Sequence, residues 1–276
     1  MIPRDLASRV GKLYKSENQA GVTSFFQKHP ILLLLLLSPG IPEYLSSSSP
    51  FSALILGPGR FLFQIVANLG LYGPGVILVR EALVRWKKGL GTSLALGAAY
   101  GVLEEGITAA TMFNPDSPSR SLHGYAWWLG VNWVWSPSIT IFHMVYSITL
   151  PILLSRLALP VKNGEPLLAG RKIAAAFAIL FADVVVMMTV VYYSDHFTLG
   201  FSRFIGSVLV IAILVLTGAK MPTSFLSPKS SNPKKTPLAF VLLGLAFFPT
   251  LIFSESIGSD LNVPVSCPFM LLAIAD

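Results

Sequence analysis

The chain has 276 residues, of which 53% are hydrophobic and only 12% are charged. These proportions exclude an ordinary soluble globular domain and predict an integral membrane protein with several spans. The formal charge of +7 does not indicate a nucleic-acid partner, because the basic residues form short clusters between apolar runs, as topology signals do. The single cysteine, Cys267, excludes an internal disulfide and a cysteine-based zinc site.

The order of polar and apolar runs predicts an all-α fold, a polytopic transmembrane helical bundle. A polar tail, residues 1–29, precedes a single transmembrane helical domain, residues 30–276. Seven full spans are expected at 31–44, 61–79, 90–112, 137–154, 173–193, 204–219 and 238–253. The first of them is interrupted by prolines and a glycine at 39–42. Residues 263–275 form a short C-terminal hydrophobic segment, below the roughly 20 residues that a full span needs.

Lysine and arginine alternate between dense and sparse loops along this series of spans. Five precede residue 30, and groups of four lie in 80–88, 156–172 and 220–235. The opposite loops hold only Arg60, Arg120 and Arg203. The positive-inside rule therefore predicts a protein of the cytoplasmic membrane with a cytoplasmic N-terminus. The tryptophans and tyrosine of 125–135 are typical of a segment at headgroup level.

The most informative stretch is the third predicted span, which carries adjacent acids, Glu104 and Glu105, inside an apolar helix. An ionised acid at bilayer depth costs about 2.5–3.5 kcal/mol on insertion scales, so the pair needs a partner, a proton, a metal or a water cavity. Gly97 and Gly101 precede it as a G-x-x-x-G step, which permits close approach of another helix. We therefore expect the pair to be pressed against a neighbouring span.

Counting from the span ends gives each buried polar residue a depth, at about 1.5 Å per residue. The acid pair and His143 each come out about 21 Å from the inner edge of a hydrocarbon core about 30 Å thick, so they could meet. Glu43, Asn68 and Asp183 fall at about 18–20 Å on the same scale. Each of these supporting residues also has an ordinary interpretation: a cap on freed amides, a hydrogen bond between helices, and a paired or protonated acid.

Two resemblances follow from these residues. The first is to a group of uncharacterised prokaryotic multi-pass membrane proteins and covers about residues 30–160; it implies no activity. It rests on Asn68, Tyr72-Gly73, Gly75, Arg80-Glu81, Gly97, Tyr100-Gly101, Glu104-Glu105-Gly106, Phe113-Asn114-Pro115, His143, Ser147-Ile148 and Pro151.

The second, more distant, is to the CPBP family of CAAX-type intramembrane proteases, also called Abi proteins. Glu104-Glu105 resembles the acid pair of its Glu-Glu-x-x-x-Arg motif, and His143 follows at a similar spacing. Ala109 stands in place of the motif's arginine and Ile139 in place of the phenylalanine of Phe-x-x-x-His, and the family's third motif is missing.

The resemblance implies an intramembrane endopeptidase with Glu104, Glu105 and His143 as catalytic residues and a membrane-embedded peptide as substrate. Asp183 and Asn68 are the candidates for the missing third group, and Asp183 is the better of the two. The chain would use either no cofactor or a divalent metal such as zinc, held by Glu104 and His143. Two other functions stay open: an ion- or proton-coupled carrier using the buried acids, and a non-catalytic membrane scaffold. Lipid is the expected surrounding partner in each case.

Overall fold

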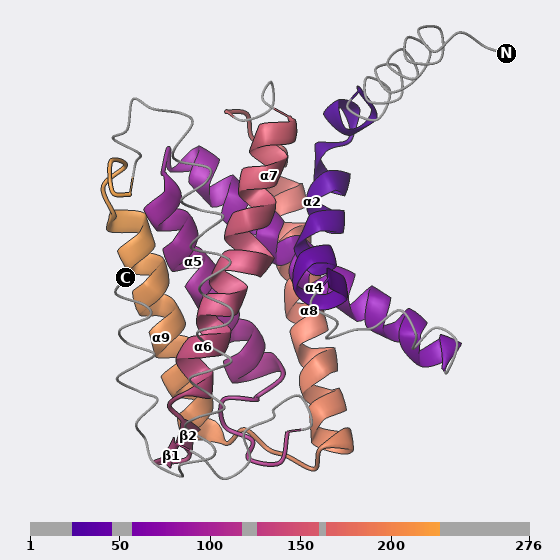
Figure 1. Ribbon diagram of the computed structural model, residues 1–276, viewed down its shortest axis with the longest axis vertical. Coiled ribbons are helices and arrows are strands. Elements are labelled where there is room, and N and C mark those ends of the chain that lie inside the picture. Colours follow the sequence, from indigo (N-terminus) through magenta and orange to yellow (C-terminus); the bar gives the residue numbers. More distant parts are fainter. Residues whose placement is uncertain (1–23, 46–56, 118–125, 160–163, 227–276) are drawn as a thin grey trace, which may run out of the picture.

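The computed structural model describes residues 24–45, 57–117, 126–159 and 164–226, which form a helical bundle with one small hairpin at an end (Figure 1). The α-helices are α2 (Pro30–Pro39), α4 (Pro58–Arg85), α5 (Leu90–Val102), α6 (Trp135–Phe142), α7 (Leu150–Ala158), α8 (Gly170–Ser194) and α9 (Phe201–Lys220). The hairpin pairs β1 (Trp127–Trp128) with β2 (Val131–Asn132) in antiparallel register.

Three π-helical segments continue or join these helices. The segment η1 (Gly40–Leu45) extends α2, η2 (Leu103–Thr108) extends α5, and η3 (His143–Thr149) joins α6 to α7. A π-helical turn bonds residue i to i+5; it is rare in proteins and is frequently found at functional sites. The predicted acid pair, His143 and Glu43 all lie in these three segments.

The described residues confirm a membrane protein with several spans but not all seven of the predicted spans. Four helices of the described residues are long and apolar enough to cross a membrane: Pro58–Arg85, Trp135–Ala158, Gly170–Ser194 and Phe201–Lys220. Pro30–Leu45 is a shorter apolar helix. The span expected at 90–112 ends at Thr108, because Ala110 takes a left-handed conformation (φ 53°) that cannot continue a helix. The runs at 238–253 and 263–275 lie outside the described residues.

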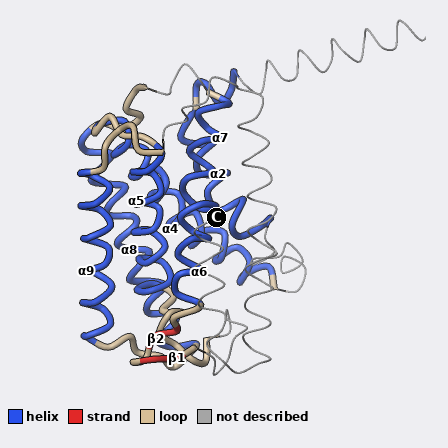
Figure 2. The backbone as a smooth tube through the Cα atoms, turned by 60° about the vertical axis from the view of Figure 1, so that its left-hand side comes forward, coloured by secondary structure: helices blue, strands red, loops and turns tan. Residues whose placement is uncertain are grey.

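The helix that carries the acids lies inside the bundle. Helix α5 packs against η3 and α9, while α4 packs against α2 and α8. Figure 2 shows α5, α8 and α9 running along a common direction, with the hairpin at one end. Large apolar side chains of α8 and α9, such as Phe181 and Leu209, are exposed. In an integral membrane protein such faces meet lipid, and the interior is left for polar side chains.

Two sets of loop contacts define the two ends of the bundle. At one end Arg85 Nη2 donates to the Leu168 carbonyl (2.6 Å) and Lys88 Nζ donates to the Met221 carbonyl (2.7 Å). At the other end the Asn132 amide of the hairpin donates to the Met112 carbonyl (3.0 Å). The basic loops therefore gather at one end and the tryptophan hairpin at the other.

Candidate acid–imidazole site

Two glycines of α5 bring the helix that carries the acids against the helix that carries the histidine. A Cβ added at Gly97 would lie 2.8 Å from the Met144 carbonyl oxygen, and one added at Gly101 would lie 3.1 Å from the Thr140 carbonyl oxygen. Only glycine permits this approach without a shift of backbone. The close contact predicted from the G-x-x-x-G step is present, and it places His143 opposite the acid pair.

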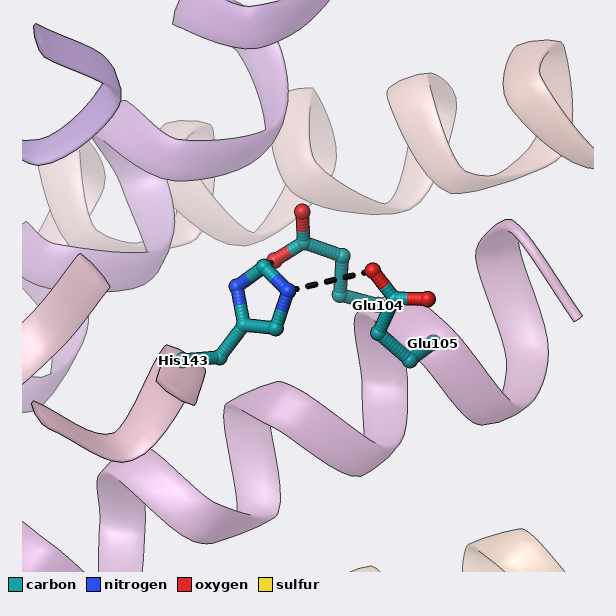
Figure 3. A group of neighbouring side chains, drawn as sticks. All are labelled: Glu104, Glu105 and His143. Carbon is teal, nitrogen blue, oxygen red and sulfur yellow. Dashed lines mark hydrogen bonds and ion pairs between the residues drawn. The ribbon is translucent and has the colours of Figure 1, made fainter. Parts of the chain in front are cut away.

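His143 is the centre of a short hydrogen-bonded series. Its Nε2 lies 3.1 Å from Glu105 Oε1, and its Nδ1 lies 2.8 Å from Ser147 Oγ, one turn further along the same helix. The imidazole is almost fully enclosed, with 3% of its side chain exposed, against 12% for Glu105. Figure 3 shows the Glu105 carboxyl group reaching the ring nitrogen across the gap between the two helices. Both ring nitrogens are thus engaged, which fixes the orientation of the ring.

Glu104 approaches the same ring in a different way. Its Oε2 is 3.0 Å from His143 Nδ1, which is close enough for an ion pair. This oxygen makes no hydrogen bond to any residue that the structure describes. Two buried phenols, Tyr72 and Tyr100, interact with the Glu104 charge. Their ring centroids lie 6.1 and 6.4 Å from that of His143. Of the two acids, Glu104 is therefore the one with an oxygen that makes no hydrogen bond to the described residues.

Glu105 is held from its other side. The Thr111 hydroxyl donates to Glu105 Oε2, and the indole Nε1 of Trp135 donates to Thr111 Oγ1 (2.9 Å). Trp135 begins α6, directly after the tryptophan hairpin. The carboxylate that contacts the imidazole is thus fixed by a series of contacts that leads to the hairpin end of the bundle.

Glu43 and Asp183, two of the three supporting residues, interact with groups of this centre, and Asn68 interacts with Tyr44. Tyr72 donates a hydrogen bond from its hydroxyl to Glu43 Oε1 and so lies between Glu43 and Glu104. Asp183 packs against the backbone of α4 at Gly70, where an added Cβ would lie 2.6 Å from its Oδ1. Its charge acts on Glu104, whereas Asn68 interacts with Tyr44.

The same centre offers ligands for a metal. One oxygen from Glu104, one from Glu105 and one nitrogen of His143 lie within 4.8 Å of one another. Among the described residues this is the only group of three such side chains. Asp183 and Glu43 are not part of it.

The structure adds four residues that the sequence did not assign to the centre: Tyr72, Tyr100, Thr111 and Trp135. Tyr72 follows Asn68 by four positions, so helical spacing alone would have placed it on the same face. Thr111 has no such signal, because it reaches back to Glu105 only after the chain reverses at Ala110. Ser147 follows His143 by four positions, and its hydroxyl contacts the ring from the same side of the helix.

Comparison with known proteins identifies the family and nothing narrower. The profile of an uncharacterized membrane protein family matches residues 32–271. No curated protein and no solved structure matches the chain. Because the match covers most of the sequence, the chain belongs to this uncharacterized membrane protein family.

Proposed function

We propose that this member of an uncharacterized membrane protein family is a CPBP-like intramembrane peptidase of the cytoplasmic membrane. The observation that supports it is the enclosure of Glu104, Glu105 and His143 between two packed helices inside the bundle. Ionisable groups at membrane depth are costly and mark functional sites by default. A carboxyl pair beside an imidazole is a suitable set for acid–base hydrolysis of a peptide bond that lies in the membrane.

The two acids have different roles in this proposal. Glu105 is occupied by His143 and Thr111, so it orients the imidazole and balances its charge. Glu104 keeps Oε2 without a hydrogen bond to the described residues and is the general base. Adjacent carboxylates cannot both ionise easily, so a pair of this kind can hold one proton and accept another.

The proposed reaction is a proton transfer followed by acyl cleavage. Glu104 takes a proton from water, and the water oxygen bonds to the carbonyl carbon of the peptide. The buried Tyr100 hydroxyl, which has no hydrogen-bond partner among the described residues, donates to the oxygen that becomes negative. The C–N bond then breaks, and Glu104 returns the proton to the leaving amine.

A proton- or ion-coupled carrier is the second candidate, and one observation favours it. Two further acids surround the centre, with Glu43 linked through Tyr72 and Asp183 acting on Glu104. Groups of buried acids are typical of proton relays and ion pathways. The hydrolysis proposed above uses neither of these two further acids.

The deciding experiment uses the full chain in liposomes with a library of membrane-anchored peptides. The variants are Glu104→Gln, Glu105→Gln and His143→Ala, and the matched control is Asp195→Asn, a partly exposed acid directly after α8. A hydrolase loses turnover in Glu104→Gln by at least about 100-fold, because an amide cannot accept the proton. The control cleaves at the wild-type rate.

Other results would replace the proposal. If the wild type cleaves nothing but drives ion flux that the same glutamine variants abolish, the carrier is correct. If it does neither and the glutamine variants melt at a higher temperature than the wild type, the acids are a structural burden and the protein is a scaffold.

A further inference from the structure

We infer that Arg80 of α4 and Arg156 of α7 form a binding site for the phosphate of an anionic phospholipid at the basic end of the bundle. The ligand is a headgroup of the phosphatidylglycerol class, which carries a single negative charge. The site shares no residue with the acid–imidazole centre and does not depend on the proposed peptidase. Three observations support it: the burial of Arg80, the charges around it, and the position of Arg156 beside lipid-facing leucines.

Arg80 is held in an enclosed position near the end of α4. Its side chain is only 7% exposed, and its Nη1 donates to Glu81 Oε1 (2.8 Å). An arginine that acts only as a topology signal extends its guanidinium group into water, as basic side chains at span ends usually do. Arg80 instead keeps its charge inside the protein, where a charge is tolerated only if other groups balance it.

Glu81, the acid that pairs with Arg80, also contacts other donors. Its Oε2 accepts a hydrogen bond from Arg85 Nε (3.2 Å), and its Oε1 accepts one from the Leu167 backbone amide (2.7 Å). One negative charge is therefore shared between two guanidinium groups. Glu165 also acts on Arg80, but its side chain is exposed, so water screens that interaction.

Arg156 adds a third positive charge to this cluster. It belongs to α7, which contacts α4, and its charge and that of Arg80 repel each other. With Arg85, the cluster holds three positive groups against the carboxylates of Glu81 and Glu165, which leaves a net charge of +1. An anion that contacts both Arg80 and Arg156 replaces their repulsion by two attractions. An anion with one negative charge makes the cluster neutral.

The position of Arg156 on α7 favours a lipid over a soluble anion. Arg156 follows the buried Ile152 by four positions and the exposed Leu153 by three, so it lies at the border between the inner face and the lipid-facing face. Leu157, the next residue, is 78% exposed. A phosphate at Arg156 therefore has its acyl chains beside exposed leucines. Guanidinium groups bind phosphate through paired N–H donors, and basic pockets between membrane helices recognise anionic headgroups.

The charge of the cluster selects among phospholipids. A phosphatidylglycerol headgroup brings one negative charge, whereas phosphatidylcholine brings its own positive group and adds no net charge. The predicted orientation places the basic end of the bundle at the cytoplasmic leaflet, whose surface is negative because of its anionic lipids.

The experiment counts the lipids that bind to the purified full chain in detergent micelles. The protein is titrated with dioleoyl-phosphatidylglycerol, with dioleoyl-phosphatidylcholine or with inorganic phosphate. Native mass spectrometry gives the number of bound lipids, and thermal unfolding gives the shift in melting temperature. We expect one phosphatidylglycerol molecule per chain to bind more tightly than phosphatidylcholine and to raise the melting temperature. Inorganic phosphate should produce no such rise.

Three variants locate the site. Arg156→Gln should weaken phosphatidylglycerol binding about 10- to 100-fold, because it removes charge-assisted hydrogen bonds to the phosphate. Arg156→Lys keeps the charge but loses the paired donors, so its affinity should fall between that of Arg156→Gln and that of the wild type. The matched control is Lys220→Gln, which removes an exposed lysine at the end of α9 and should change the affinity by no more than about fivefold.

Three results would overturn the inference. The first is equal binding of phosphatidylglycerol and phosphatidylcholine by the wild type. The second is phosphatidylglycerol binding by the Arg156 variants that matches binding by Lys220→Gln; if Arg156→Gln does not fold, Arg156→Lys decides this point. The third is a thermal rise that inorganic phosphate alone reproduces, which would make the cluster a site for a soluble anion. Each variant is compared with its own melting temperature in phosphatidylcholine, so a change in stability is not mistaken for a change in binding.

Discussion

The close contact between α5 and η3 can be tested with a single methyl group. A Cβ at Gly97 would lie 2.8 Å from the carbonyl oxygen of Met144 and 3.1 Å from its Cα. Both are backbone atoms, so the two helices must separate, and overpacking of this kind costs about 1–3 kcal/mol. Replacing glycine by alanine within a helix contributes about 0.5–1 kcal/mol in the opposite direction. We therefore expect Gly97→Ala to lower stability by about 0.5–2 kcal/mol.

The matched control is Gly206→Ala, the same chemical change inside α9, one turn after its start. A Cβ there meets nothing within 4 Å, so only the stabilising contribution remains. At about 2–4 °C per kcal/mol for a chain of this size, Gly97→Ala melts about 1–8 °C below the wild type, and Gly206→Ala melts slightly above it. Thermal unfolding in one detergent measures both. If Gly97→Ala melts as high as Gly206→Ala, the close-approach argument is wrong.

Two further predictions concern the ends of the bundle. Glu81→Gln removes the carboxylate that pairs with buried Arg80 (2.8 Å) and accepts a hydrogen bond from the Leu167 backbone amide. The free energy of unfolding, measured by chemical denaturation, should fall by about 3–5 kcal/mol. Retention of wild-type stability would contradict this prediction. The predicted orientation can be tested by cysteine labelling in a Cys267→Ser background. Leu129→Cys in the hairpin should react with an impermeant maleimide from outside the cell, whereas Gly164→Cys should react only after permeabilisation. The reverse labelling would invert the predicted orientation.

The meeting of the acids with His143 was predictable because it depends on regular geometry. Helical rise is constant, so residue counts from the span ends place both at one depth. The Gly97 and Gly101 step then selects the helix face that a neighbour can approach. Neither inference needs tertiary information. The contact between His143 and Glu105 at 3.1 Å bears out that part of the sequence analysis.

The sequence did not predict which of the two acids makes which contact. Which carboxyl group meets Nε2 depends on the local helix type, and Thr111 reaches Glu105 through a left-handed residue, Ala110, whose sequence carries no turn signal. The end of the third predicted span was misplaced for a related reason. Hydropathy detects apolar runs, but it does not detect that Ala110 ends the helix of α5 and η2 before the apolar run ends.

The π-helical segments explain how one imidazole can contact the carboxyl groups of two adjacent acids. In a regular α-helix consecutive side chains diverge by about 100°, so Glu104 and Glu105 would face different neighbours. A π-turn contains more residues and therefore reduces that angle, which lets both carboxyl groups approach His143. His143 begins a π-segment of its own, and Ser147 lies in the same segment. Regular hydrogen bonding is thus given up on both packed helices at the same depth. Such geometry is less stable than an α-helix and needs a compensating gain, which the convergence of the polar groups supplies.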